Sequence, residues 1–229
     1  TCLAATAADP GRADVSRIVV TDPALLDALC ALGLQDAVTA VTAGTDSVPA
    51  YLGPELAQVP TIGAEPSADA VREAKAQLVL TTAGTEDRLA ALRATGALGD
   101  AEIETVPVDG DWRASFTAVA EALGRSRAAS ERLEEFDAEA ARVGRIKDAA
   151  HSQVSLVRFT ADHEWIEGTG GFAAGILSQV GAQRPVAQRG AEAVEITAEN
   201  FTAADGDQIY VGADGPKGLE RAKSVLESD

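Results

Sequence analysis

Short apolar runs rich in β-branched residues alternate with amphipathic stretches along most of the chain. Residues 17–20 (RIVV) predict a strand, and Asp22-Pro23 supplies the N-cap and first-turn proline of a helix that ends at Gly33. Further strands are expected at 37–41, 78–80, 103–106, 154–160, 164–167, 194–197 and 208–211, and further helices at 84–95, 172–180 and 218–226, with another capped by Ser67. Strand–helix alternation is typical of a mainly parallel sheet covered by helices, so the pattern predicts the α/β class.

Residues 111–150 break this rhythm. From 111 to 149 there is no proline, only Gly124 and Gly144 interrupt the segment, and apolar residues recur at near-helical spacing. The segment predicts either one helix of about ten turns or two helices joined near Gly124. It could serve as a dimerisation arm or as a stiff connector between two α/β lobes. As a connector, it divides the chain into an N-terminal lobe at 1–110, an inter-lobe helix at 111–150 and a C-terminal lobe at 151–229.

The charge balance excludes some partners. The 36 acidic residues outnumber the 19 basic ones and give a formal net charge of −17. A nucleic acid would be repelled by that charge, so no nucleic-acid partner is expected. No run reaches the roughly 18 apolar residues that cross a membrane, and no signal peptide is recognisable. The chain starts at Thr1 without an initiator methionine, so we expect a processed or trimmed chain.

Cys2 and Cys30 are the only cysteines. A zinc-finger site needs four closely paired ligands, so no metal site of that kind is expected. The two cysteines predict either a disulfide between the N-terminal tail and the first helix or two unrelated thiols. Lipid attachment at Cys2 is disfavoured because a lipidated cysteine would be the mature N-terminus and Thr1 precedes it.

The sequence holds no recognisable catalytic constellation. His151 and His163 are the only histidines, and the G-x-S-x-G, H-E-x-x-H and P-loop patterns are all missing. Residues 168–175 are rich in glycine, but their spacing departs from G-x-G-x-x-G and predicts a turn that leads into the helix at 172–180. We therefore expect neither an enzyme nor a cofactor.

Candidate ligand contacts follow from a general rule for open α/β sheets, in which ligands lie beyond the carboxyl ends of the strands. The rule selects Tyr51 and Trp112 in the first lobe and, less directly, Arg158, Trp165 and Arg189 in the second. Arginine offers a planar fork for carboxylate, hydroxamate or phenolate oxygens, and aromatic rings stack on flat ligands. These five residues form the predicted ligand-binding set.

Several motifs resemble one known family. Residues 27–35 (DALCALGLQ), followed by 51–53 (YLG), resemble the first lobe of the FecB-type iron-siderophore-binding lipoproteins of mycobacteria and their relatives. Residues 155–159 (SLVRF) and 172–177 (FAAGIL) are similar to the second lobe of that family. Arg184-Pro185, Gln188-Arg189 and Glu195-Ile196 match it in the same order. The order and spacing of these motifs, across most of the chain, carry the resemblance.

The resemblance implies the class III substrate-binding fold, in which two α/β lobes joined by one long rigid helix enclose a shallow cleft. It also implies a Cys2–Cys30 disulfide, because relatives carry cysteines in similar positions. The sequence departs from the family in two respects. Trp165 stands where relatives often have arginine, and relatives continue well beyond residues 226–229, so the second lobe is expected to be truncated at its C-terminus.

The function that the resemblance implies is that of a monomeric, extracytoplasmic solute-binding protein of an iron-uptake ABC transporter. It would take a ferric siderophore in the cleft, deliver it to a membrane permease, and be lipid-anchored at the cell envelope through a residue upstream of this chain. One alternative is haem binding, with Tyr51, His163 or Tyr210 as the axial ligand. Another is a cell-envelope interaction protein that keeps the fold without the cleft chemistry.

Overall fold

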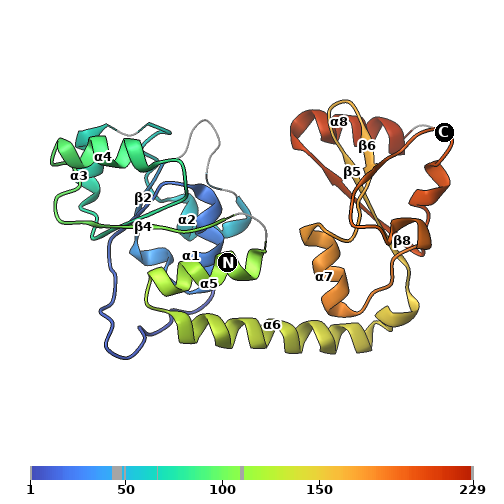
Figure 1. Cartoon of the computed structure of the whole chain (residues 1–229), viewed down its shortest axis with the longest axis horizontal. Helices are drawn as coiled ribbons and strands as arrows, with labels where there is room; N and C mark the ends of the chain where they lie inside the picture. The colour runs from blue at the N-terminus through green and yellow to red at the C-terminus, as the bar shows by residue number, and fades with distance from the viewer. Residues whose placement is uncertain (1, 43–47, 49, 66, 109–110, 228–229) are drawn as a thin grey trace. The chain divides into compact units, whose positions relative to one another are not determined.

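The computed structural model describes residues 2–42, 48, 50–65, 67–108 and 111–227. The chain divides into two compact units, Thr1–Glu134 and Glu135–Asp229, which are described separately below. Their elements are labelled in Figure 1.

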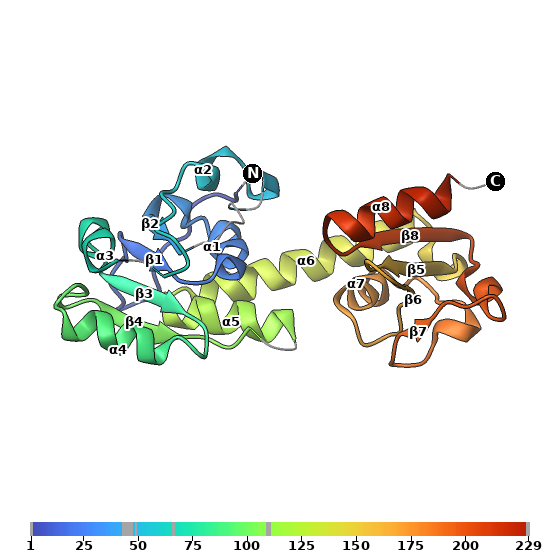
Figure 2. The same ribbon diagram turned by 90° about the horizontal axis from the view of Figure 1, so that it is seen from above.

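The first unit is built on a parallel sheet of four strands. The strands are β1 (Ile18–Val20), β2 (Val38–Val41), β3 (Leu78–Thr81) and β4 (Glu102–Thr105). Their order is β2-β1-β3-β4, and every pair is parallel (Figure 2). The central strands β1 and β3 are buried on both faces, which explains why the sequence shows them as uninterrupted apolar runs rather than as alternating ones.

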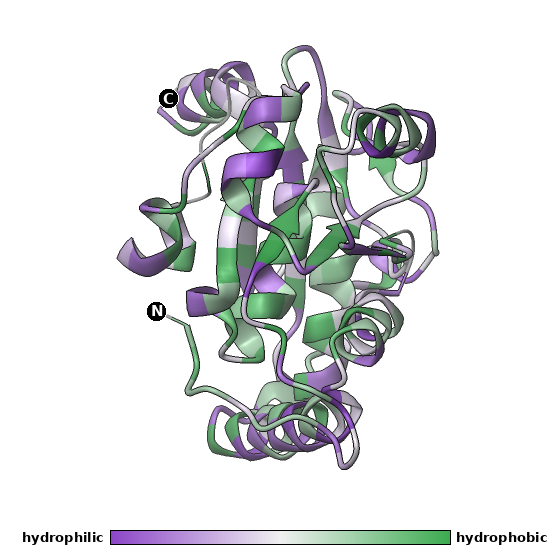
Figure 3. Cartoon of the chain, turned by 90° about the vertical axis from the view of Figure 1, so that its left-hand side faces the viewer, coloured by the Kyte–Doolittle hydropathy of each residue, from purple (hydrophilic) through white to green (hydrophobic). Residues whose placement is uncertain are grey.

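Helices cover both faces of this sheet. They are η1 (Pro23–Leu25), α1 (Leu26–Ala31), η2 (Gln35–Ala37), η3 (Ala50–Leu52), α2 (Pro54–Ala57), α3 (Ala68–Ala74), α4 (Glu86–Ala94) and α5 (Trp112–Ala122). Ile18 and Leu80 pack toward α1 and α5, whereas Val19 and Val79 pack toward α3 and α4. Figure 1 shows the two helix pairs on opposite sides of the strands, and Figure 3 shows the hydrophobic residues concentrated in the central strands.

Residues 111–150 form two helices rather than one. α5 ends at Ala122 and α6 (Ser126–Ile146) follows after a short break. Gly124 lies in this break with a φ of +62°, a left-handed conformation that glycine adopts without strain. Gly144, the other glycine of the segment, stays inside α6, and a Cβ there would overlap the carbonyl oxygen of Val180. The structure thus agrees with the two-helix alternative.

The N-terminal residues 2–14, here termed the N-terminal strap, are fastened to the first unit at several points. A disulfide joins Cys2 to Cys30 of α1, the pairing that the family resemblance implies. The Thr6 hydroxyl donates to the Leu32 carbonyl oxygen, and the Asp9 carboxylate accepts from two backbone N–H groups at the start of α6. Gly33 is required here because a Cβ would overlap the backbone of Ala4.

The second unit contains a mixed sheet. Its strands are β5 (Val154–Phe159), β6 (Glu164–Ile166), β7 (Val194–Glu195) and β8 (Gln208–Ala213), in the order β7-β6-β5-β8. β8 is parallel to β5, whereas β6 and β7 are antiparallel to their neighbours.

Two helices lie on opposite faces of this second sheet (Figure 1). α7 (Phe172–Val180) covers the face that carries Val154 and Leu156, and α8 (Gly215–Leu226) packs against Val157 and Phe159 through Ala222. The short helices η4 (Ala149–His151), η5 (Val186–Gln188) and η6 (Phe201–Ala204) complete the unit. Among the described residues, no helix is long and apolar enough to cross a membrane.

Candidate functional site

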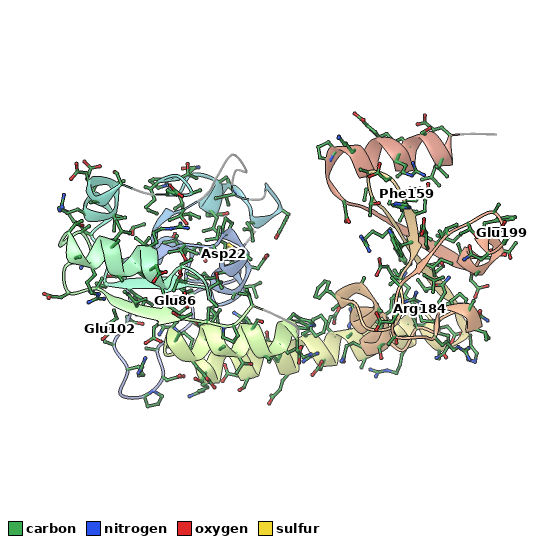
Figure 4. The ribbon with its side chains drawn as sticks, turned by 45° about the horizontal axis from the view of Figure 1, so that its top comes forward. Asp22, Glu86, Glu102, Phe159, Arg184 and Glu199 are labelled. Carbon is green, nitrogen blue, oxygen red and sulfur yellow. A yellow bond between two sulfur atoms is a disulfide. The ribbon has the colours of Figure 1, made fainter. Side chains whose placement is uncertain are left out.

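In the first unit, the order of the strands reverses between β1 and β3, which is where open α/β sheets bind ligands. Threonine hydroxyls gather at this point. The Thr21 and Thr81 Oγ1 atoms lie 2.5 Å apart, Thr85 lies 2.5 Å from Thr81, and the Thr82 hydroxyl donates to the Asp22 carboxylate at 3.3 Å. Asp22 and the nearby Glu86 are labelled in Figure 4. The hydroxyls of Thr21, Thr81 and Thr85 therefore hydrogen-bond to one another, and the Asp22 carboxylate is the charged group beside them.

The two predicted aromatic contacts of the first unit come from different elements. Tyr51 lies on η3 with 68% of its surface exposed, and its hydroxyl donates to the Asp27 carboxylate at 2.8 Å. This hydrogen bond, together with burial and the charge of Asp27, raises the pKa of Tyr51. Trp112 opens α5 directly after its N-cap Asp111, and the Arg113 guanidinium lies 4.8 Å from the centre of the indole ring.

The second unit brings two of the predicted residues together. Arg158 on β5 and Trp165 on β6 are directly opposite in the antiparallel register. Arg158 is also engaged by two carboxylates that sequence analysis did not identify. Its Nε lies 2.5 Å from the Glu167 Oε1, and its Nη1 lies 2.7 Å from the Asp214 Oδ2. The hydrogen bonds to Glu167 and then to Asp214 raise the pKa of Arg158, and its single positive charge lies against two carboxylates.

A further acidic group lies on the other side of Trp165. Glu195 of β7 is the register partner of Trp165, which places both side chains on the same face of the sheet. The His163 Nδ1 lies 2.5 Å from the Glu195 Oε1, and the His163 ring centre lies 6.2 Å from that of Trp165. The indole is therefore flanked by Arg158 on one strand and by Glu195 on the other.

A buried polar network supports the segment that carries Glu167. Arg184 is only 8% exposed and donates to the carbonyl oxygen of Glu167 at 2.6 Å and to the Gln188 Oε1 at 2.7 Å. Gln188, 2% exposed, donates in turn to the Ser155 Oγ at 2.6 Å and to the carbonyl oxygen of Ala203 at 2.8 Å. Burial lowers the pKa of Arg184. Figure 4 labels Arg184 within this unit.

Arg189, the fifth predicted contact, lies outside the sheet. It is exposed at the end of η5, and its Nε donates to the carbonyl oxygen of Arg184 at 3.1 Å. The glycine-rich segment forms the turn that the sequence predicts, with Gly171 as the N-cap of α7. Gly168 is required in this turn because a Cβ would overlap the carbonyl oxygen of Ala191.

An apolar groove of about 790 Å³ runs between α7, the end of α6 and the sheet. Val143, Leu156, Phe172, Ile176 and Tyr210 are among the residues that line it. Phe172 and Tyr210 are both more than half exposed, so the groove is open to solvent.

Metal ligands do not cluster in the described part of the chain. No group of three or more histidine, cysteine, aspartate or glutamate side chains is arranged there to hold a metal ion.

Comparison with known proteins assigns the fold. The family model described as "Periplasmic binding protein" matches residues 18–229. A curated relative, "Probable siderophore-binding lipoprotein YfiY" of Bacillus subtilis, is 27% identical over 180 residues, which are 77% of this chain and 54% of that protein. The chain thus spans about half the length of this relative.

Solved structures agree on the fold. The Staphylococcus aureus SirA–staphyloferrin B complex has a TM-score of 0.69 at 20% identity, covering 95% of this chain and 80% of that one. Unliganded FhuD2 from Staphylococcus aureus has a TM-score of 0.73 at 19% identity, covering 94% and 77%. The siderophore periplasmic binding protein from the fuscachelin gene cluster of Thermobifida fusca has a TM-score of 0.68 at 18% identity, covering 95% and 84%. The expected class III binding-protein fold is confirmed.

Proposed function

The chain belongs to the periplasmic binding protein family, and on that premise we propose that it is the extracytoplasmic component of an iron-uptake ABC importer that captures a ferric siderophore. It is a binding protein, as its relatives are, and not an enzyme. The observation that carries the proposal is the family match over residues 18–229, joined to a curated relative that is named for siderophore binding.

The local chemistry supports this reading. Trp165 offers a half-buried aromatic face, and Arg158 lies directly opposite it on a rigid strand. Rigid strands hold such groups more constantly than loops do, which favours a preformed contact surface. We assign ligand contacts to these two residues and to Tyr51, Trp112 and Arg189. We further propose that the protein is a monomer and that it delivers its ligand to a membrane permease. A lipid anchor would be attached to a residue upstream of this chain.

Haem is not carried forward as the ligand. Two of the relatives described above are named for siderophore binding, and none is named for haem. Of the three residues considered as haem ligands, Tyr51 donates to Asp27 and His163 is paired with Glu195. Tyr210 lies on β8, beside the apolar groove.

Tryptophan fluorescence tests the proposal directly, because Trp112 and Trp165 are the only indoles. Titration of the purified chain with ferric siderophores of several chemical classes is expected to quench the emission with saturation at micromolar ligand. Trp165→Phe should remove most of the quenching, and Trp112→Phe serves as the matched variant that keeps the second-unit indole. Absence of saturable quenching with every class, together with a stable protein partner recovered instead, would favour the interaction-protein alternative.

A further inference from the structure

The sheet face around Trp165 carries more negative than positive charge. Five described residues define this face, here termed the Trp165 face: Arg158, Trp165, Glu167, Glu195 and Asp214. They contribute one guanidinium and three carboxylates. The buried Arg184 guanidinium, which also interacts with the charge of Glu167, still leaves one carboxylate in excess (three against two).

Neither bidentate edge of the Arg158 guanidinium is free to bind an anion. A guanidinium presents two bidentate edges, one through Nε with a terminal nitrogen and one through its two terminal nitrogens. Glu167 occupies Nε and Asp214 occupies Nη1, so each edge already has one donor engaged by a carboxylate. An anionic ligand that approached Arg158 would also meet these two carboxylates, and like charges at such distances oppose binding.

The carboxylates are firmly placed. The carbonyl oxygen of Glu167 accepts from buried Arg184, and Gly168 follows in a turn that tolerates no side chain. Asp214 directly follows β8, which is in continuous parallel register with β5, and its backbone N–H donates to the Phe159 carbonyl oxygen at 2.8 Å. Their position beside Arg158 is therefore a property of the folded unit.

We propose that the Trp165 face selects ferric siderophores that carry no net negative charge, and that Glu167 and Asp214 determine this selectivity. This inference rests on the proposed function and narrows its ligand class. Three singly charged hydroxamates balance Fe³⁺ and leave a neutral complex, which becomes cationic if the chelator bears a free amine. Three doubly charged catecholates leave a trianion. The indole and its surrounding carboxylates suit the neutral or cationic hydroxamate complexes, since aromatic faces and carboxylates both attract cations.

Competition between chelates of different charge tests this inference. The probes are a neutral ferric trishydroxamate, a cationic one with a free amine, and a ferric tris-catecholate trianion, each titrated against tryptophan fluorescence of the full chain. We expect the neutral and cationic complexes to bind roughly tenfold or more tightly than the trianion. Raising the salt concentration should narrow that ratio, because exposed charges are screened.

Two variants identify the residues responsible. Glu167→Gln and Asp214→Asn, singly and together, should strengthen binding of the trianion and leave the neutral complex nearly unchanged. The matched control is Glu164→Gln, which removes the same charge from the neighbouring position of β6, where the side chain instead pairs with Arg221 of α8. This control should leave the ratio of the affinities for the neutral complex and the trianion unchanged. Circular dichroism verifies that each variant is folded.

The outcomes separate this inference from the function on which it rests. If the trianion binds the unaltered chain as tightly as the neutral complex does, or if the Glu167 and Asp214 variants leave the ratio unchanged, the charge selectivity is wrong while siderophore capture stands. If no ferric chelate of any charge binds, both proposals are overturned.

Discussion

The two units of this chain differ in how much of their interior is apolar. In the first unit, buried apolar residues such as Ile18 and Val79 form continuous layers on both sides of a parallel sheet, and the buried polar residues among those described are Arg125 and three threonines. In the second unit, the buried apolar cluster of described residues centres on Val157 and Phe159, and hydrogen-bonded polar side chains share the interior with it.

The difference in interior composition indicates what each unit is suited to do. Apolar packing stabilises in proportion to the area buried but has little directional preference. A buried arginine that is fixed by hydrogen bonds costs desolvation and in return holds particular backbone atoms in place, here the carbonyl oxygens of Glu167 and Gly168. The first unit thus has the more extensive apolar packing, whereas the second holds in place the polar face to which we assign the ligand.

Removal of the disulfide, which lies in the first unit, should have the largest effect on the free energy of unfolding. Replacing Cys2 and Cys30 together by alanine opens a crosslink across a sequence separation of 28 residues. The chain-entropy estimate predicts a loss of about 3.5 kcal/mol from the free energy of unfolding. Backbone hydrogen exchange should accelerate across the first unit and stay unchanged in the second. Equal acceleration in both units would mean that they unfold as one.

Truncation of a core side chain in the first unit should have the next largest effect. Leu29 is fully buried in α1, and Leu29→Ala should lower the free energy of unfolding by about 3 kcal/mol through lost burial and the cavity left behind. Leu219→Ala on α8 of the second unit is the matched control, because that side chain is 48% exposed. Chemical denaturation should show a change within about 0.5 kcal/mol for the control. A similar loss for both would remove the contrast between the units.

In the second unit, removal of a buried polar side chain should lower the free energy of unfolding. Arg184→Met removes the donor to the Glu167 carbonyl oxygen and the shorter of two hydrogen bonds to the Gln188 Oε1, at a cost of about 2 kcal/mol. Amide exchange should increase in residues 167–171. Arg189→Met, at an exposed position, is the comparison variant and should change little. If Arg184→Met leaves both the free energy of unfolding and the amide exchange unchanged, the buried network does not hold residues 167–171 in place.

How far the sequence predicts this structure differs between the fold and the site. Most strands and caps could be located, because a strand buried on both faces is an uninterrupted apolar run and Asp22 caps its helix locally. The choice between one helix and two helices joined near Gly124 could not be made. It depends on whether Gly124 adopts a left-handed φ, which is fixed by the packing of the folded unit.

The site was predicted only in part for the same reason. Arg158 and Trp165 are close in sequence and share a hairpin, so their pairing follows from short-range structure. Asp214 reaches Arg158 across 56 residues, through the parallel register of β8 with β5. Glu167 could have been found, since it lies two residues after Trp165 and so projects to the same face.

The smallest expected effect concerns the charge of Asp9 in the N-terminal strap. Burial raises the pKa of Asp9, but the N–H groups of Arg127 and Ser126 lower it by more, so the net shift is downward from the ordinary value of 3.8. A carboxyl with a lowered pKa stabilises the fold above its unfolded-state pKa and loses that contribution as the pH falls through its folded-state pKa. Asp9→Asn keeps a capping oxygen without the charge. The unfolding free energies of the two proteins should converge below about pH 4; a difference that grows there would contradict this account.

The N-terminal strap also has a mechanical consequence. Force applied from any segment upstream of Cys2 enters the fold across the Cys2–Cys30 bond and passes directly into α1. The hydrogen bonds of Leu3, Thr6 and Asp9 then carry no load. Once the disulfide is reduced, the same pull acts on these bonds one after another and ends at the first turn of α6. A single covalent bond therefore decides whether the domain resists tension as one body or peels from its end.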